Sequence, residues 1–255
     1  MKRLTCLVAI FLLAGCSHET SWEDRDYAED MDVAQTVFDN GRMAQAEFKY
    51  REAFKRAFLV NDPQAIHDAG FNLATSQVRQ NHVKDALKTI DRTLSALENR
   101  QFAQRDDLHL IKAAALYRQK HYQASMREAR WAQSSSDRAT ADEAVAFVGY
   151  NAAVLKDDAT LSATIQTLSH ADKMRNRANL LELQTLSDLA HHQWLQALGK
   201  AQTLVVYRRE NDDYLAMRRA LELQVQAYNG SGQWQDAQRV RQQIKDSVAQ
   251  EKNGR

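Results

Sequence analysis

The sequence predicts an all-α protein built as an α-solenoid of about six antiparallel helical hairpins. Three observations support this class. Residues that break helices are scarce, with one proline and eight glycines among 255 residues. Ala, Leu, Gln, Glu, Arg and Lys, which are good helix formers, fill most of the chain. A pattern of apolar and small residues also recurs at a nearly fixed spacing along the chain, which is the signature of a repeat architecture.

The N-terminal segment, residues 1–15, has the features of a signal peptide. Lys2 and Arg3 precede an apolar run over residues 4–13, which is too short to span a bilayer but fits a secretory signal. The segment ends in Leu-Ala-Gly followed by Cys16, and this resembles the lipobox of bacterial lipoproteins. The resemblance implies diacylglycerol on the sulfur of Cys16, cleavage before it, and acylation of the new amino group. Ser17, rather than aspartate, then implies sorting to the outer membrane.

Residues 16–30 are expected to form a lipidated acidic tether. Six acids and a single base, Arg25, lie between Ser17 and Asp30, which is typical of a solvated linker. Removing residues 1–15 takes Lys2 and Arg3 from the 34 basic residues, which leaves 32 against 33 acids. This balance gives no general attraction to nucleic acid. Cys6 and Cys16 are the two cysteines, so the body after the tether has no disulfide.

The repeat is clearest near the C-terminus. Leu-Glu-Leu-Gln at 181–184 returns at 221–224, Gln-Trp at 193–194 returns at 233–234, and Ala197 returns as Ala237. A large apolar residue followed three positions later by a small one can be traced back along the chain. The small residues are Ala46, Ala86, Ser125, a weaker Ala163, Ala197 and Ala237. Their spacing predicts six hairpins over residues 31–250, with a disordered tail at 251–255.

Each predicted unit has a first helix, a polar turn and a second helix. The turns fall at 40–41, 80–81, 119–120, 156–158, 191–192 and 229–232, and Gly and Asn suit the left-handed conformation that ends a helix. Trp194, Trp234, Tyr122 and Tyr150 are expected to pack in the core, because they occupy repeat positions next to the small residues. A polar residue, Arg241, replaces the apolar one in the last unit, as expected of a terminal helix.

These units resemble tetratricopeptide repeats. The residues that carry the resemblance are Ala46, Tyr50 and Ala53 in the first unit, Leu73, Ala74, Ala86 and Ile90 in the second, and Tyr228, Gly232, Trp234 and Ala237 in the sixth. The chain departs from that family in its period, about 39 residues rather than 34, and in having only Pro63 as a helix-ending proline. The resemblance implies a concave groove that holds an extended peptide or a partner's helix.

No arrangement of residues predicts catalysis, a cofactor or a metal site. The sequence has no Gly-rich phosphate loop, no Gly-x-Ser-x-Gly and no His-Glu-x-x-His. His191 and His192 are interpreted as polar turn residues, because the equivalent turns hold His82 and His121 and no cysteine or paired carboxylate accompanies them. The basic pairs at 208–209 and 218–219 are interpreted as helix caps or solvated faces.

We therefore expect the protein to act by binding a partner in the groove, which is lined by the first helices of successive units. Two asparagines there are expected to hydrogen-bond a bound peptide, whereas the aromatic residues fit either groove or core. The candidate groove residues are Phe71, Asn72, Thr75, Arg79, Tyr117, Arg118, Tyr150 and Asn151.

The predicted function is an outer-membrane-anchored lipoprotein that faces the periplasm and serves as a protein-binding scaffold or adaptor in assembly of a cell-envelope complex. Its partners are a protein or peptide of the envelope and the membrane itself, through the lipid on Cys16. This class includes pilotins for secretins or type IV pili, outer-membrane assembly factors, and adaptors for cell-wall hydrolases and proteases. A regulatory solenoid that binds a small ligand or a peptidoglycan fragment is the alternative.

Overall fold

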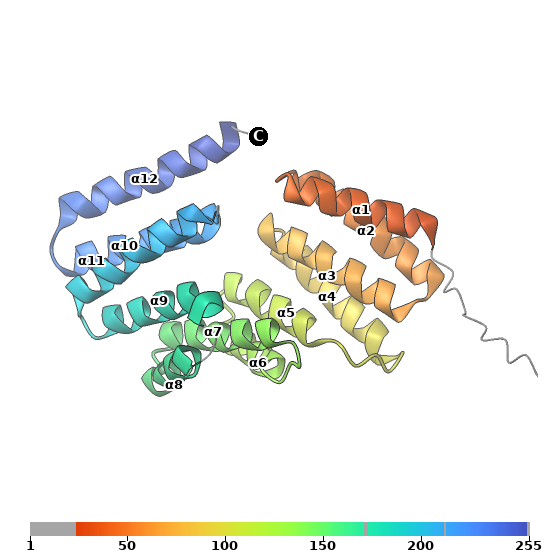
Figure 1. Ribbon diagram of the computed structural model, residues 1–255, viewed down its shortest axis with the longest axis horizontal. Helices are drawn as coiled ribbons and strands as arrows, with labels where there is room; N and C mark the ends of the chain where they lie inside the picture. Colours follow the sequence, from red (N-terminus) through yellow and green to blue (C-terminus); the bar gives the residue numbers. More distant parts are fainter. Residues whose placement is uncertain (1–23, 171–172, 212, 254–255) are drawn as a thin grey trace, which may run out of the picture.

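A computed structural model describes residues 24–170, 173–211 and 213–253 (Figure 1). Within these ranges the chain forms twelve α-helices and no strand. The helices are α1 (Arg25–Asp39), α2 (Met43–Val60), α3 (Pro63–Arg79), α4 (Val83–Glu98), α5 (Asp106–Arg118), α6 (Tyr122–Ala132), α7 (Arg138–Leu155), α8 (Asp158–His170), α9 (Lys173–Ala190), α10 (Trp194–Glu210), α11 (Tyr214–Gly230) and α12 (Trp234–Asn253). The predicted all-α class is confirmed.

The six predicted hairpins are the six successive helix pairs, from α1–α2 to α11–α12. All six turns close in the same way. One residue has a positive φ, and the N–H of the next residue donates to the carbonyl five positions back at 2.8–3.0 Å, a motif that satisfies the end of a helix. The positive-φ residues are Gly41, Asn81, Lys120, Lys156, His192 and Gly232. His192 holds the positive-φ position of its turn, and His82, next to another, has Nδ1 2.9 Å from Oε2 of Glu47.

Aspartates start four of the first helices. The side chains of Asp24, Asp62, Asp137 and Asp213 each accept a hydrogen bond from the N–H three residues on, at 2.7–3.1 Å. Such N-caps satisfy a backbone donor that the helix leaves unpaired. The single proline, Pro63, is the first residue of α3, where its missing N–H costs nothing.

Small residues allow the two helices of each unit to approach closely. Five of the six predicted small residues are fully buried, namely Ala46, Ala86, Ser125, Ala197 and Ala237. The sixth prediction, Ala163, is wrong because that residue is exposed. In the other five units the small residue lies five positions after the positive-φ residue, and in the fourth unit that position is held by Leu161, which is buried. The fourth unit is therefore shifted by two residues relative to the sequence alignment. Thr164, three residues further along α8, makes the close contact with α7, its hydroxyl lying 2.7 Å from where a Cβ on Gly149 would be.

The expected boundaries of the tether and tail need correction. Helix α1 begins at Arg25, so residues 24–30 belong to the folded body rather than to the tether. The reason is that Asp24 is buried and accepts a hydrogen bond from Nε of Arg56 on α2 at 2.7 Å. At the other end α12 extends to Asn253, past the predicted start of the tail. The signal peptide and Cys16 lie outside the described residues.

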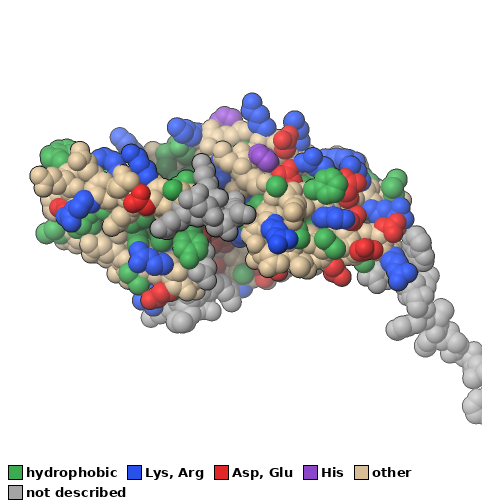
Figure 2. Space-filling view, turned by 90° about the horizontal axis from the view of Figure 1, so that it is seen from above, with side chains coloured by type: hydrophobic (Ala, Val, Ile, Leu, Met, Phe, Trp, Pro, Cys, Tyr) green, Lys and Arg blue, Asp and Glu red, His purple; other side chains and the backbone are tan. Residues whose placement is uncertain are grey.

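The units stack into an arc in which the first helices face inward. Helices α3, α5, α7, α9 and α11 contact one another in succession, whereas the second helices each contact only the helices before and after them. Figure 1 shows the resulting curve, with α1 and α12 at its two ends. Seen from above in Figure 2, a recess separates these two ends. In the part of the chain that the structure describes, no helix combines the length and the apolar character needed to cross a membrane.

Candidate binding groove

A row of aromatic rings lines part of the inner face of the arc. Tyr117 on α5 and Phe147 on α7 pack edge to face with centroids 6.3 Å apart, and Phe147 packs in the same way on Tyr150 at 5.7 Å. Tyr122, at the start of α6, extends the row with its centroid 5.3 Å from that of Tyr117. We call these four residues the aromatic row. Tyr117, Tyr122 and Phe147 are partly exposed, so the row presents ring surface to a ligand.

The aromatic row leads into a set of polar side chains on the next helices. The hydroxyl of Tyr150 donates to Oδ1 of Asn179 at 3.1 Å, and Nδ2 of Asn179 donates to Oε2 of Glu143 at 2.6 Å. The carboxylate of Glu182 forms ion pairs with two arginines. Nε of Arg219 lies 3.4 Å from Oε1, and Nη2 of Arg208 lies 3.6 Å from Oε2. We call Glu143, Asn179, Glu182, Arg208 and Arg219 the polar cluster. It ties α7, α9, α10 and α11 together.

Protonation states follow from burial in this region. Burial, reinforced by the negative charges of Glu182 and Glu143, raises the pKa of Tyr150 well above its usual range. The phenol of Tyr150 therefore stays a neutral donor to Asn179. Burial also raises the pKa of the Glu143 carboxyl. Burial raises the pKa of Tyr117 to about 12, so its hydroxyl is a neutral group facing the groove.

Two arginines from distant units, Arg118 and Arg219, lie close enough for their charges to interact. Arg118 ends α5 and Arg219 lies on α11. Desolvation inside the curve and then the positive charge of Arg219 lower the pKa of Arg118. Within the described residues Arg118 has no hydrogen bond or ion pair, whereas Arg219 is paired with Glu182. Arg118 therefore adds an unpaired positive charge beside the aromatic row.

The structure brings three of the predicted groove residues together, namely Tyr117, Arg118 and Tyr150. The four predicted residues on α3 form a separate group nearer to α1. There Phe71 stacks on His67 with centroids 6.3 Å apart, and Arg79 lies 4.8 Å from the ring centre of Phe38. Asn72 and Thr75 donate to carbonyls of their own helix, at 2.9 and 2.8 Å.

Asn151 is not a groove residue, which corrects the expectation that it binds peptide backbone. Its side chain is fully buried, and Nδ2 donates to Oγ of Ser125 at 2.9 Å and to the carbonyl of Phe147 at 2.7 Å. It faces α6 instead of the groove. Asn72 is partly exposed, so the two asparagines that looked equivalent in sequence have different environments.

Several residues of the site were missed from the sequence, namely Glu143, Phe147, Asn179, Glu182, Arg208 and Arg219. A signal was present for Glu182, because it interrupts the apolar run at 180–183. The two arginines were interpreted as helix caps or solvated face residues. The structure instead places both beside Glu182, on the inner face.

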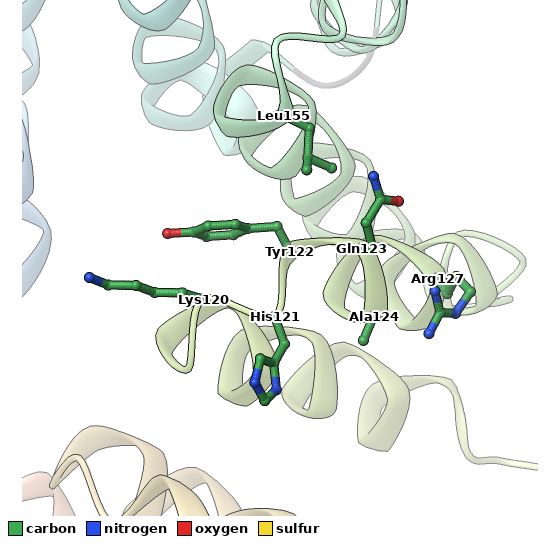
Figure 3. Close-up of a pocket in the computed structure, with 7 residues that line it drawn as sticks. All are labelled: Lys120, His121, Tyr122, Gln123, Ala124, Arg127 and Leu155. Carbon is green, nitrogen blue, oxygen red and sulfur yellow. The ribbon is translucent and has the colours of Figure 1, made fainter.

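An open hollow of about 370 Å³ adjoins the end of the aromatic row (Figure 3). In that view Tyr122 and Lys120 extend in the same direction from the turn between α5 and α6, and Leu155 lies above Tyr122. Lys120 adds a further positive charge at this point. No three His, Cys, Asp or Glu side chains among those described are placed to hold a metal ion.

The geometry and repeat pattern define a solenoid of tetratricopeptide-like helical repeats. A tetratricopeptide repeat protein from Parabacteroides merdae has a similar structure, with a TM-score of 0.55 and 14% identity, over 88% of this chain and 80% of that one. The Rap protein complexed with Competence and Sporulation Factor has a TM-score of 0.60 and 11% identity, over 90% of this chain and 76% of that one. At these identities the likeness shows the fold. No protein-family model matches the chain, and no curated protein sequence matches it.

Proposed function

We propose that this protein is a lipid-anchored scaffold of the outer membrane, which binds a peptide segment of a cell-envelope protein in its groove and serves as an adaptor in assembly of an envelope complex. The observation that carries the proposal is the aromatic row leading into the polar cluster on the inner face. Rings held by edge-to-face packing give a ligand a large contact area at little cost in side-chain entropy. The solved structure of the Rap protein, with its bound factor, supports binding by this kind of fold.

The charges of the groove indicate the chemistry of the bound segment. Glu182 neutralises part of the charge of Arg208 and Arg219, and Arg118 adds an uncompensated positive charge. A carboxylate of the partner, placed between Arg118 and Arg219, would form charge-assisted hydrogen bonds. The favoured ligand is therefore a segment with aromatic or apolar side chains and an acidic group.

Pull-down from cross-linked, detergent-solubilised envelope tests the groove. The full chain should recover a partner that the double variant Tyr117→Ala, Phe147→Ala does not. Trp131→Ala is the matched control, because Trp131 is an exposed aromatic residue near the end of α6, away from the aromatic row. Equal recovery by wild type and the groove variant would refute binding through the aromatic row, and no recovered protein would remove the main support for a scaffold.

The lipid anchor is tested separately. Cys16→Ala should move the protein from the membrane fraction to the soluble fraction, because the thioether-linked acyl chains hold it there. Unchanged membrane association would refute lipidation at Cys16. Density-gradient separation of the wild type should place it with the outer membrane.

A further inference from the structure

The last two units have the same local structure but different surroundings. Helices α10 and α12 begin at Trp194 and Trp234, forty residues apart, after turns whose positive-φ residues are His192 and Gly232. In both turns the N–H before the tryptophan donates to the carbonyl five positions back at 2.8 Å. The environment of Trp194 therefore shows what Trp234 is shaped to contact.

Trp194 packs on the first helix of the next unit. A Cβ built on Gly230, the last residue of α11, would lie 2.6 Å from the Trp194 ring, so the glycine allows direct contact of ring and backbone. Further along α10, Ala201 and Val205 are buried in one core cluster with Ala220 and Leu223 of α11. Trp194, Ala201 and Val205 form the strip of α10 that joins unit five to unit six, and the half-buried Leu198 lies between them in the same helical row.

The same strip of α12 is uncovered and basic. Trp234 is 63% exposed, which corrects its expected place in the core. The residues forty positions after Leu198, Ala201 and Val205 are Gln238, Arg241 and Lys245, all exposed. We call Trp234, Gln238, Arg241 and Lys245 the tail strip.

The opposite end of the arc presents an acidic counterpart. Aligning the turn of the first unit with that of the last, Gly41 with Gly232, identifies the residues of α1 that correspond to a strip of α11 ending at Gly230, beside the ring of Trp194. The positions of Ala220, Leu223, Ala227 and Gly230 are taken by Glu29, Asp32, Thr36 and Asp39, and all four are exposed. We call these four residues the head strip. Figure 2 shows Asp and Glu side chains on this end of the molecule, interspersed with Lys and Arg side chains.

We propose that the tail strip of one copy packs on the head strip of a second copy, so that the solenoid continues from molecule to molecule. Trp234 then lies against the C-terminal end of α1, and Arg241 and Lys245 face Asp32 and Glu29. An open apolar hollow of about 360 Å³ between α1 and α2, lined in part by Val33, Val37 and Phe48, adds apolar surface at the same end. Contacts of this head-to-tail kind build chains or rings rather than two-fold dimers.

Terminal units of solenoids carry polar strips for solubility, and either strip alone would need no partner. Here the strips have opposite charge, occupy corresponding positions, and include an exposed tryptophan whose equivalent is packed within the chain. Opposite charge at matched positions favours association and fixes its register. These three features together favour a second copy of this chain as the partner that binds the tail strip.

Sedimentation velocity of the full chain, with detergent micelles in large excess, tests the contact. The wild type should associate with rising concentration, and more so at low salt. Arg241→Glu with Lys245→Glu, or Glu29→Lys with Asp32→Lys, should each weaken association by roughly tenfold or more. An equimolar mixture of the two variants, and a chain with all four changes, should regain it, because opposite charges meet again. Trp234→Ala should weaken association without changing its salt dependence.

Lys84→Glu with Lys88→Glu on α4 is the matched control, with the same charge change away from both strips, and should associate like the wild type. Regain of association in the mixture also shows that the variants fold. A wild type that is monomeric at all concentrations and salts would overturn the proposal. Association that the reversals leave unchanged would overturn it as well, since sharing of micelles affects all variants alike.

Discussion

Nε2 of His67 on α3 lies 3.0 Å from Oδ1 of Asp107 on α5, and this contact joins the second and third units. The other ring nitrogen, Nδ1, lies 2.8 Å from Asp68. Burial opposes the charged form of His67, but the hydrogen bonds to Asp107 and Asp68 outweigh it and raise the pKa to about 9. The imidazole is therefore a cation at neutral pH, held between two carboxylates.

The stability of the protein should depend on this pair in a defined pH range. Because the folded pKa of His67 is above its unfolded value, its contribution is complete below about pH 6.5 and is lost as the pH rises through about 9. Asp107→Asn should lower the free energy of unfolding by about 2 kcal/mol at pH 6 and by little at pH 10. Urea denaturation at both pH values measures this. Asp106→Asn, in the same first turn of α5, controls for the helix dipole, and an equal loss in both variants would contradict the pairing.

Gly149 is expected to be intolerant of any side chain. A Cβ there would lie 2.7 Å from Leu183 and from Thr164, on two different helices. Gly149→Ala should therefore destabilise the fold by about 1–3 kcal/mol through overpacking. Gly199→Ala is the control, because nothing lies within 4 Å of its added Cβ, and it should stabilise α10 by about 0.5–1 kcal/mol. Thermal unfolding distinguishes them, and a harmless Gly149→Ala would show that the helices can separate.

The features predicted from sequence are those that depend on neighbouring residues in the chain. The turns at Asn40-Gly41 and 229–232 and the small residues at Ala46 and Ala237 were found because each unit repeats one local pattern. Ala163 failed because the turn before α8 places Leu161, rather than Ala163, five residues after the positive-φ residue, which is the position of the small residue in the other units. Trp234 follows the repeat in sequence, but no later unit among the described residues covers it.

The groove was predicted only in part, because its composition depends on the curvature of the stack. Tyr117 and Arg118 were found since they lie at the end of a first helix, next to a turn. Glu182 and Arg219 come from separate units, and their contact at 3.4 Å depends on how far successive hairpins rotate. Asn151 was assigned to the groove by analogy with Asn72, but the rotation of α7 points it at Ser125.

Glu182 should be more important for stability than its repeat equivalent, Glu222. Glu182 is 6% exposed and neutralises Arg208 and Arg219, whereas Glu222 is exposed. Glu182→Gln keeps the shape but leaves Arg219 without its counter-charge and Arg208 with Asp213 alone, so it should cost about 1–3 kcal/mol. Glu222→Gln should change stability by less than about 0.5 kcal/mol. Chemical denaturation of the two variants measures the difference, and equal values would refute the structural role of the polar cluster.

Arg118 should affect binding and leave stability unchanged, because it has no partner among the described residues. Once a partner is in hand, Arg118→Ala should weaken its binding by about tenfold at low salt, with a smaller loss at high salt. Lys84→Ala, an exposed residue on the second helix α4, is the control. Titration at two ionic strengths measures both effects. An affinity that is unchanged in Arg118→Ala would contradict the binding of an acidic ligand in this part of the groove.

Lys156 has a φ of 59° at the end of α7, in the left-handed region that glycine adopts without strain. Lys156→Gly should therefore stabilise the fold by up to about 1 kcal/mol. Lys84→Gly, within α4, should destabilise it by about 1 kcal/mol. Opposite shifts in the midpoint of thermal unfolding are expected, and a loss in both variants would mean that the side chain of Lys156 contributes contacts of its own.

The six identical turns have a consequence for how such a chain can change in length. A stretch that starts at one positive-φ residue and ends just before the next begins and finishes in the same backbone conformation. Such a stretch is an interchangeable module, and its duplication or deletion leaves the backbone on either side unaltered. The number of units, and with it the length of the groove, is therefore a quantity that evolution can adjust in whole steps.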